Sequence, residues 1–64
     1  MTKVGDNLTF EVNGEVKHGK VVNIYTQVGY ENHGKEIVVI SLFDSHLRFY
    51  EGEIKITNEN LKII

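Results

Sequence analysis

Residues 36–43 have the sequence Glu-Ile-Val-Val-Ile-Ser-Leu-Phe, and this stretch decides the fold. Six of its eight residues are apolar, and Ser41 is the only polar residue inside the apolar run. Branched apolar side chains pack well on a pleated sheet but lose rotamer freedom on a helix. A short continuous apolar run of this kind is typical of a central strand that is covered on both faces. We therefore predict a buried strand over residues 36–43.

The composition of the whole chain also favours strands. In 64 residues there is no Ala, Pro, Cys or Trp, while Val, Ile and Thr together occupy 19 positions. Ala is the best helix former, and no long window of the sequence keeps a 3.6-residue apolar period. The length fits a single domain over residues 1–64 that buries only about 60% of its unfolded surface. We predict an all-β fold of five to six short antiparallel strands.

Alternation of apolar and polar residues, interrupted by turn residues, places the other strands. We expect extended segments at residues 4–12, 20–25, 47–50, 53–57 and 62–64, and one short helical turn at residues 58–61. Gly19 and Gly52 are interpreted as breaks before the second strand and after the fourth. Residues 26–35 read as a long loop.

Asn13 and Gly14 mark the first chain reversal, because both tolerate the positive φ that tight hairpin turns need. A two-residue turn would pair Phe10 with Lys17, which places an apolar side chain opposite a charged one. A three-residue loop would pair Phe10 with Val16 and accept one exposed contact between like charges. We favour the three-residue loop because apolar pairing should outweigh that contact.

A small sheet can hide its edges by closing on itself, so we expect a barrel. Its core should consist of the apolar residues that share one face of the predicted strands. These are Leu8, Phe10, Val21, Ile24, Val38, Ile40, Leu42, Leu47, Ile54, Ile56 and Leu61.

Glycines and apolar residues recur near both ends of the chain in a familiar order. The residues concerned are Val4-Gly5-Asp6, Phe10, Asn13-Gly14, Gly19, Val21 and Ile24 at the start, and Ile54, Ile56, Leu61 and Ile63 at the end. This layout resembles SH3-like small barrels of the KOW type, in which a helical turn links the last two strands. The resemblance implies a setting near RNA, DNA or larger nucleic-acid machines. The missing Trp weighs against recognition of proline-rich peptides.

The chain offers little chemistry for catalysis or metal binding. Asp44, Ser45 and His46 have the residue types of a hydrolytic triad, but neighbouring side chains on a turn splay apart and cannot align. His18, His33 and His46 lack the spacing of metal ligands on one strand face. We expect no enzymatic activity, no cofactor and no metal.

Aromatic and basic residues provide the best candidate binding surface. Tyr, Arg and Lys can anchor a protein interface or stack and neutralise a nucleic-acid strand. The candidate partner-binding residues are Lys20, Tyr25, Tyr30, Lys35, Arg48 and Tyr50. The alternative interpretation is that Tyr25 and Phe49 are core residues and that the lysines only solubilise the chain.

We expect a non-enzymatic accessory module that docks onto another protein through the 25–35 loop and the 46–51 strand. The first alternative is weak binding of RNA or DNA through Lys20, Tyr30, Lys35 and Arg48. The formal net charge of −2 weighs against that alternative, since phosphate contacts require cations. The second alternative is a homodimer formed through an exposed strand edge.

Two further expectations concern location. The chain lacks a basic segment followed by an apolar run, so we expect no signal peptide and no membrane partner. The absence of Cys is in keeping with a reducing compartment, and we expect a cytoplasmic protein.

Overall fold

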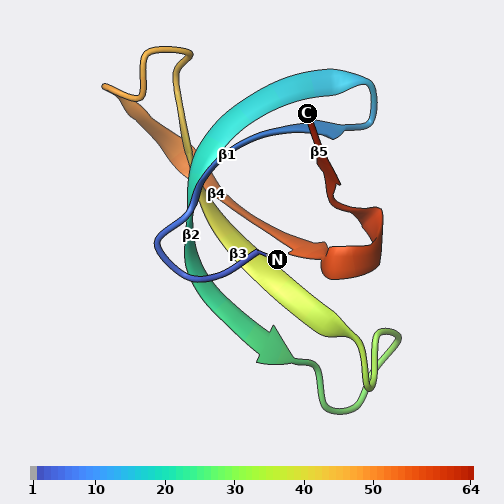
Figure 1. Cartoon of the computed structure of the whole chain (residues 1–64). Helices are drawn as coiled ribbons and strands as arrows, with labels where there is room; N and C mark the ends of the chain where they lie inside the picture. The colour runs from blue at the N-terminus through green and yellow to red at the C-terminus, as the bar shows by residue number, and fades with distance from the viewer. Residues whose placement is uncertain (1) are drawn as a thin grey trace.

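The computed structural model describes residues 2–64, which form one five-stranded antiparallel sheet (Figure 1). The elements follow one another as β1 (Asn7–Val12), β2 (Glu15–Thr26), β3 (Glu36–Phe43), β4 (Tyr50–Thr57), the 3-10 turn η1 (Asn58–Asn60) and β5 (Lys62–Ile63). Their order across the sheet is β4-β3-β2-β1-β5. The structure therefore confirms an all-β fold of five antiparallel strands with a short helical turn before the last strand.

The sheet is strongly curled but stays open (Figure 1). β4 forms one edge and β5 the other, and no ladder joins these edges within residues 2–64. The last strand is too short to bridge the gap, since its two residues pair with Phe10 and Glu11 of β1. The closure that a barrel requires is therefore not confirmed.

The core lies on the concave face of the curled sheet. Phe10, Val21, Val38 and Ile40 are fully buried at its centre. Partly buried apolar residues surround them: Leu8, Val12, Ile24, Leu42, Ile54, Ile56 and Leu61. The predicted core is confirmed except for Leu47, which is exposed, while Val12 joins the core without having been predicted.

The central strand β3 matches residues 36–43 and is buried on both faces, as predicted. Val38 and Ile40 belong to the core, and Ile37 and Val39, which alternate with them, are also buried. Neighbouring strands flank β3 on both sides, with β2 on one edge and β4 on the other. The unbroken apolar run thus reflects the central position of this strand.

Gly19 does not end a turn, and the prediction that the second strand begins at Lys20 is wrong. β2 runs without interruption through Gly19, which is buried opposite Leu42 of β3. A Cβ at this position would lie 2.5 Å from Cγ2 of Ile40 and 2.6 Å from the carbonyl oxygen of Ser41. The glycine is needed because two backbones approach closely here, and not because the chain reverses.

The predicted register of the first hairpin is also wrong. Phe10 faces Lys17, so the connection is a two-residue turn. Asn13 and Gly14 adopt φ values of 51° and 82°, the positive pair that a twisted two-residue hairpin demands. The Lys17 ammonium reaches the Glu15 carboxylate at 3.1 Å, and the Lys17 side chain is only partly exposed. The backbone preference of the turn therefore outweighs the apolar pairing on which the prediction relied.

The fourth predicted strand, residues 47–50, is wrong as well. The chain between β3 and β4 is a turn, and β4 begins at Tyr50 and continues through Gly52. Gly52 marks a bulge in the β3–β4 ladder rather than the end of a strand. The 46–51 segment is therefore a loop followed by the first residues of β4.

Candidate functional site

Four of the six predicted binding residues lie near two opposite ends of β3, whose position is shown in Figure 1. Tyr30 and Lys35 belong to the β2–β3 connection, whereas Arg48 belongs to the β3–β4 connection and Tyr50 is the first residue of β4. A strand of eight residues is about 27 Å long, at about 3.4 Å per residue. One small ligand cannot contact both ends at once.

Lys20 and Tyr25 lie between these ends, on β2. They pair with Ser41 and Ile37 of β3, on the face that alternates with the core residues. Lys20 is exposed, and Tyr25 is half-buried. These two residues share one face of the sheet, but Tyr25 lies near the β2–β3 loop and Lys20 lies four pairs further along the ladder, so the six predicted residues form no single compact cluster.

The β3–β4 connection and the strand residues on either side of it present a group of apolar side chains that we call the aromatic end: Phe43, Leu47, Phe49 and Tyr50. Leu47, Phe49 and Tyr50 are exposed by 46%, 69% and 62%. Phe43 and Tyr50 pair across the strands, and their rings meet edge to face with centroids 5.9 Å apart. The interpretation of Phe49 as a core residue is therefore wrong.

The loop of the aromatic end is held by Asp44. The backbone N–H groups of Arg48 and Phe49 donate to Oδ1 of Asp44, over 2.6 and 3.2 Å. The backbone closes the same turn, since the N–H of Leu47 donates to the Asp44 carbonyl and the N–H of Asp44 donates to the Phe49 carbonyl. The hydrogen bond from Arg48, helped by that from Phe49, lowers the pKa of the Asp44 carboxyl below its ordinary value. The carboxylate form therefore fixes the loop at neutral pH.

Leu47 adopts a left-handed backbone conformation with φ of 58°. For a residue with a side chain this conformation costs roughly 1–2 kcal/mol. The backbone N–H groups of Leu47 itself and of Arg48 donate to Asp44, and these hydrogen bonds hold the strained residue in place. The result is an exposed leucine next to two exposed aromatic rings on a loop of defined shape.

The opposite end, around Tyr30, is organised differently. Tyr30 is 93% exposed, and the backbone N–H of Gly29 donates to Nδ1 of His33 over 2.6 Å. The Lys35 side chain extends away from the loop, and its ammonium forms an ion pair with the Glu59 carboxylate of η1 over 2.6 Å. The carboxylate of Glu59 neutralises the lysine that was predicted to contact a partner.

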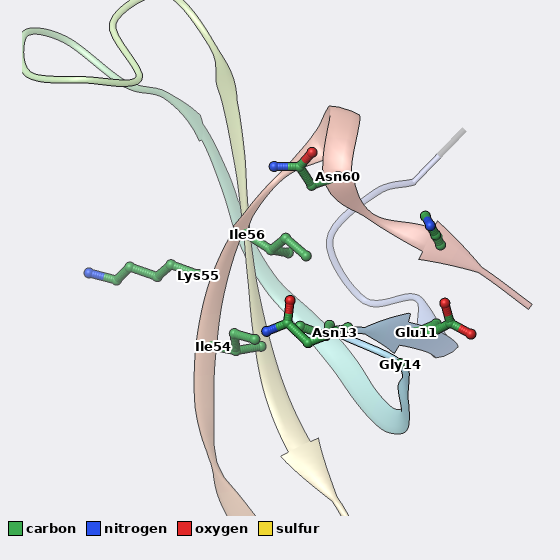
Figure 2. Close-up of a pocket in the computed structure, with 9 residues that line it drawn as sticks. Glu11, Asn13, Gly14, Ile54, Lys55, Ile56 and Asn60 are labelled. Atoms are coloured by element: carbon green, nitrogen blue, oxygen red, sulfur yellow. The ribbon is translucent and has the colours of Figure 1, made fainter.

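A groove lies on the open side of the sheet, between β4 and the turn that joins β1 to β2 (Figure 2). Its volume is about 540 Å³. Figure 2 shows Ile54 and Ile56 pointing toward Asn13 across the groove, while Lys55 points away from it. The residues that line it include charged and amide side chains but no histidine, hydroxyl or thiol group.

Residues 2–64 contain no group of three or more His, Cys, Asp or Glu side chains placed to hold a metal ion. The same part of the chain contains no helix that is long and apolar enough to cross a membrane.

Comparison of the chain with protein-family models, with curated proteins and with solved structures gives no match. The residues that stand out in the structure are therefore the guide to function. Of these, Leu47 and Phe49 lie in the predicted docking segment 46–51 but were not among the six predicted partner-binding residues. An aspartate placed before an apolar-aromatic segment was the signal for a capped loop that displays those side chains.

Proposed function

We propose that the chain is a non-enzymatic module that docks onto another protein through its aromatic end. The observation that carries this proposal is the exposure of Leu47, Phe49 and Tyr50 on a loop fixed by Asp44. Large apolar side chains that are exposed together are costly in water and commonly mark interfaces. The partner is expected to offer an apolar pocket for the Phe49 ring.

The energetics favour a few strong contacts. Full burial of a Phe side chain contributes roughly 1.5–3 kcal/mol, so burying the 69% of Phe49 that is exposed contributes about 1–2 kcal/mol. Tyr50 is already oriented by its contact with Phe43, and the turn around Asp44 is already formed. A surface ordered before binding loses less conformational entropy when it docks.

The proposed fold family is the SH3-like small barrel of the KOW type. Its support is the sequence of four strands joined in a meander, a 3-10 turn, and a short last strand that returns to β1. The gap between β4 and β5 distinguishes this chain from a closed barrel. The proposed location remains the cytoplasm, since a chain without cysteine has no disulfide to maintain.

Nucleic-acid binding is the weaker alternative. Arg48 lies at one end of β3 and Lys35 at the other, where Lys35 is paired with Glu59. Cations that are dispersed and paired release few counterions from a phosphate backbone. Titration of a short oligonucleotide at low salt, followed by backbone amide shifts, tests this alternative. Shifts around Lys35 that weaken in Lys35→Glu would favour it, and no shift at millimolar oligonucleotide would remove it.

The docking proposal is tested by affinity capture from an extract of the source cells. Phe49→Ala removes the most exposed ring of the aromatic end, and Tyr30→Ala is the matched control, because Tyr30 is an even more exposed ring at the opposite end. We expect a protein that wild type and Tyr30→Ala retain and that Phe49→Ala loses. Capture that does not depend on Phe49, or that is lost with Tyr30→Ala, would contradict docking through the aromatic end.

A further inference from the structure

β4 has an unpaired edge along its whole length. It pairs with β3 on one side, and within residues 2–64 no strand pairs with its other side (Figure 1). In an antiparallel strand every second residue directs its N–H and C=O groups away from the existing neighbour. Such an edge is a template for another strand. At the opposite edge of the sheet the last strand, β5, is two residues long.

The regular part of this edge runs from Gly52 to Thr57. The bulge in the ladder lies between the Gly52 and Tyr50 pairs, so it disturbs the first residues of β4 and leaves the rest evenly paired. The groove of Figure 2 lies beside Ile54, Lys55 and Ile56 and leaves space next to them. The chain has no proline to interrupt the edge.

Side chains alternate along this part of β4. Ile54 and Ile56 pair with Ile40 and Val38 and face the core, whereas Glu53 and Lys55 are exposed on the other face. The edge therefore presents small and large apolar residues on one face and two opposite charges on the other.

Two identical antiparallel strands related by a two-fold axis must place one residue opposite itself. With Ile54 on the axis, Glu53 of each copy faces Lys55 of the other, so two ion pairs form. On the core-facing side, Ile56 of each copy faces Gly52 of the other. A Cβ at Gly52 would meet no atom within 4 Å, so the space above Gly52 is free to receive an isoleucine.

The neighbouring two-fold registers are worse. With Glu53 on the axis, two carboxylates face each other, and with Lys55 on the axis, two ammonium groups do so. Like charges directly opposite destabilise a strand pair. The register centred on Ile54 is therefore favoured by charge, because it forms two ion pairs and places no like charges directly opposite each other.

We propose that two copies of this chain associate through antiparallel pairing of their β4 edges, with Ile54 on the two-fold axis. This surface is separate from the proposed docking through Phe49, and neither proposal depends on the other. The ladder is short, and interfaces smaller than the standard size are weak and transient. The dimer should therefore appear as concentration rises from about 10 μM to about 1 mM, the range over which weak complexes form.

Charge reversal tests the register, with sedimentation equilibrium as the measurement. Glu53→Lys places lysines opposite Lys55, and Lys55→Glu places glutamates opposite Glu53, so each variant alone should dimerise at least about tenfold more weakly than wild type. The mixture of the two variants restores both ion pairs and should dimerise like wild type. The double variant Glu53→Lys/Lys55→Glu should do the same.

Glu31→Lys is the matched control, because it makes the same charge change in the exposed β2–β3 loop and should leave dimerisation unaltered. Circular dichroism of each variant checks that the sheet is intact. A wild-type mass that stays monomeric up to about 1 mM, where even weak complexes form, would overturn the proposal. So would a mixture that behaves like its separate components, or masses that grow beyond the dimer, which would indicate head-to-tail pairing.

Discussion

Replacing Gly19 with Ala should destabilise the fold, because β2 and β3 leave no room for a side chain at this point. The added Cβ would lie 2.5 Å from Cγ2 of Ile40 and 2.6 Å from the carbonyl oxygen of Ser41. Carbon contacts are normally about 3.5–4.0 Å, so the strands must separate by about 1 Å. The methyl group of Ile40 can rotate away, but the backbone oxygen cannot.

Overpacking of this kind costs roughly 1–3 kcal/mol, and the loss of glycine freedom in the unfolded chain returns about 0.4–1 kcal/mol. We therefore expect Gly19→Ala to lower the free energy of unfolding by about 1–2 kcal/mol. A domain of 64 residues has a total of roughly 3–10 kcal/mol at about 0.05–0.15 kcal/mol per residue. The change would remove roughly a tenth to two thirds of the stability.

Urea unfolding followed by circular dichroism measures the loss, and amide shifts locate it. Gly34→Ala is the control, because its Cβ would meet nothing within 4 Å and its cost comes from a φ of 82° alone. Only Gly19→Ala should move the amide signals of Ile40 and Ser41. A Gly19→Ala protein as stable as wild type, with those signals unmoved, would refute the close approach of the two strands.

Three other predictions concern the turns and the surface. Because the pKa of Asp44 is lowered, its carboxylate stabilises the folded loop fully above the ordinary carboxyl pKa of 3.8. That stabilisation is lost as the pH falls through the lowered pKa. The amide shift of Arg48 should therefore change in this acidic range and not near neutrality. Gly14→Val forces a branched residue to a φ of 82° and should cost at least about 1–2 kcal/mol in urea unfolding; an unchanged midpoint would contradict the two-residue turn. Lys35→Met removes an exposed ion pair with Glu59 and should change the free energy of unfolding by less than about 1 kcal/mol, whereas a larger loss would show that the pair has a structural role.

The strands and the core could be predicted because they depend on side-chain pattern. The apolar run of residues 36–43 predicted β3 with its observed bounds, and alternation placed Phe10 in the core. In these places the burial of apolar area contributes most of the stabilisation, and residue type alone shows which side chains can supply it.

The turns could not be predicted from pattern alone, because backbone energetics decides them. The φ preferences of Asn13 and Gly14 fix the first hairpin against the apolar pairing. In the sequence Gly19 cannot be distinguished from a turn glycine, but in the structure it allows two strands to pack closely. Leu47 was predicted in the core because it is apolar. The hydrogen bonds to Asp44 that hold Leu47 outward cannot be seen in the sequence.

The sequence predicted which residue types form the candidate site, but it did not predict where these residues lie relative to one another. Tyr50 and Arg48 do lie at an exposed loop, but Tyr30 lies at the far end of β3. The length of β3 separates Tyr30 from Arg48 and Tyr50, which the prediction grouped by residue type alone. The open edge of β4 depends on where the sheet stops, which no local pattern reveals.

The most direct test of docking through the aromatic end is the dissociation constant of the captured protein, measured by calorimetry with purified components. Burial of the exposed part of the Phe49 ring contributes about 1–2 kcal/mol, and each 1.4 kcal/mol is a tenfold change in affinity. We predict that Phe49→Ala weakens binding by about 1–2 kcal/mol, roughly fivefold to thirtyfold, while Tyr30→Ala leaves the affinity essentially unchanged. Equal affinities of wild type and Phe49→Ala would contradict the proposed role of the aromatic end.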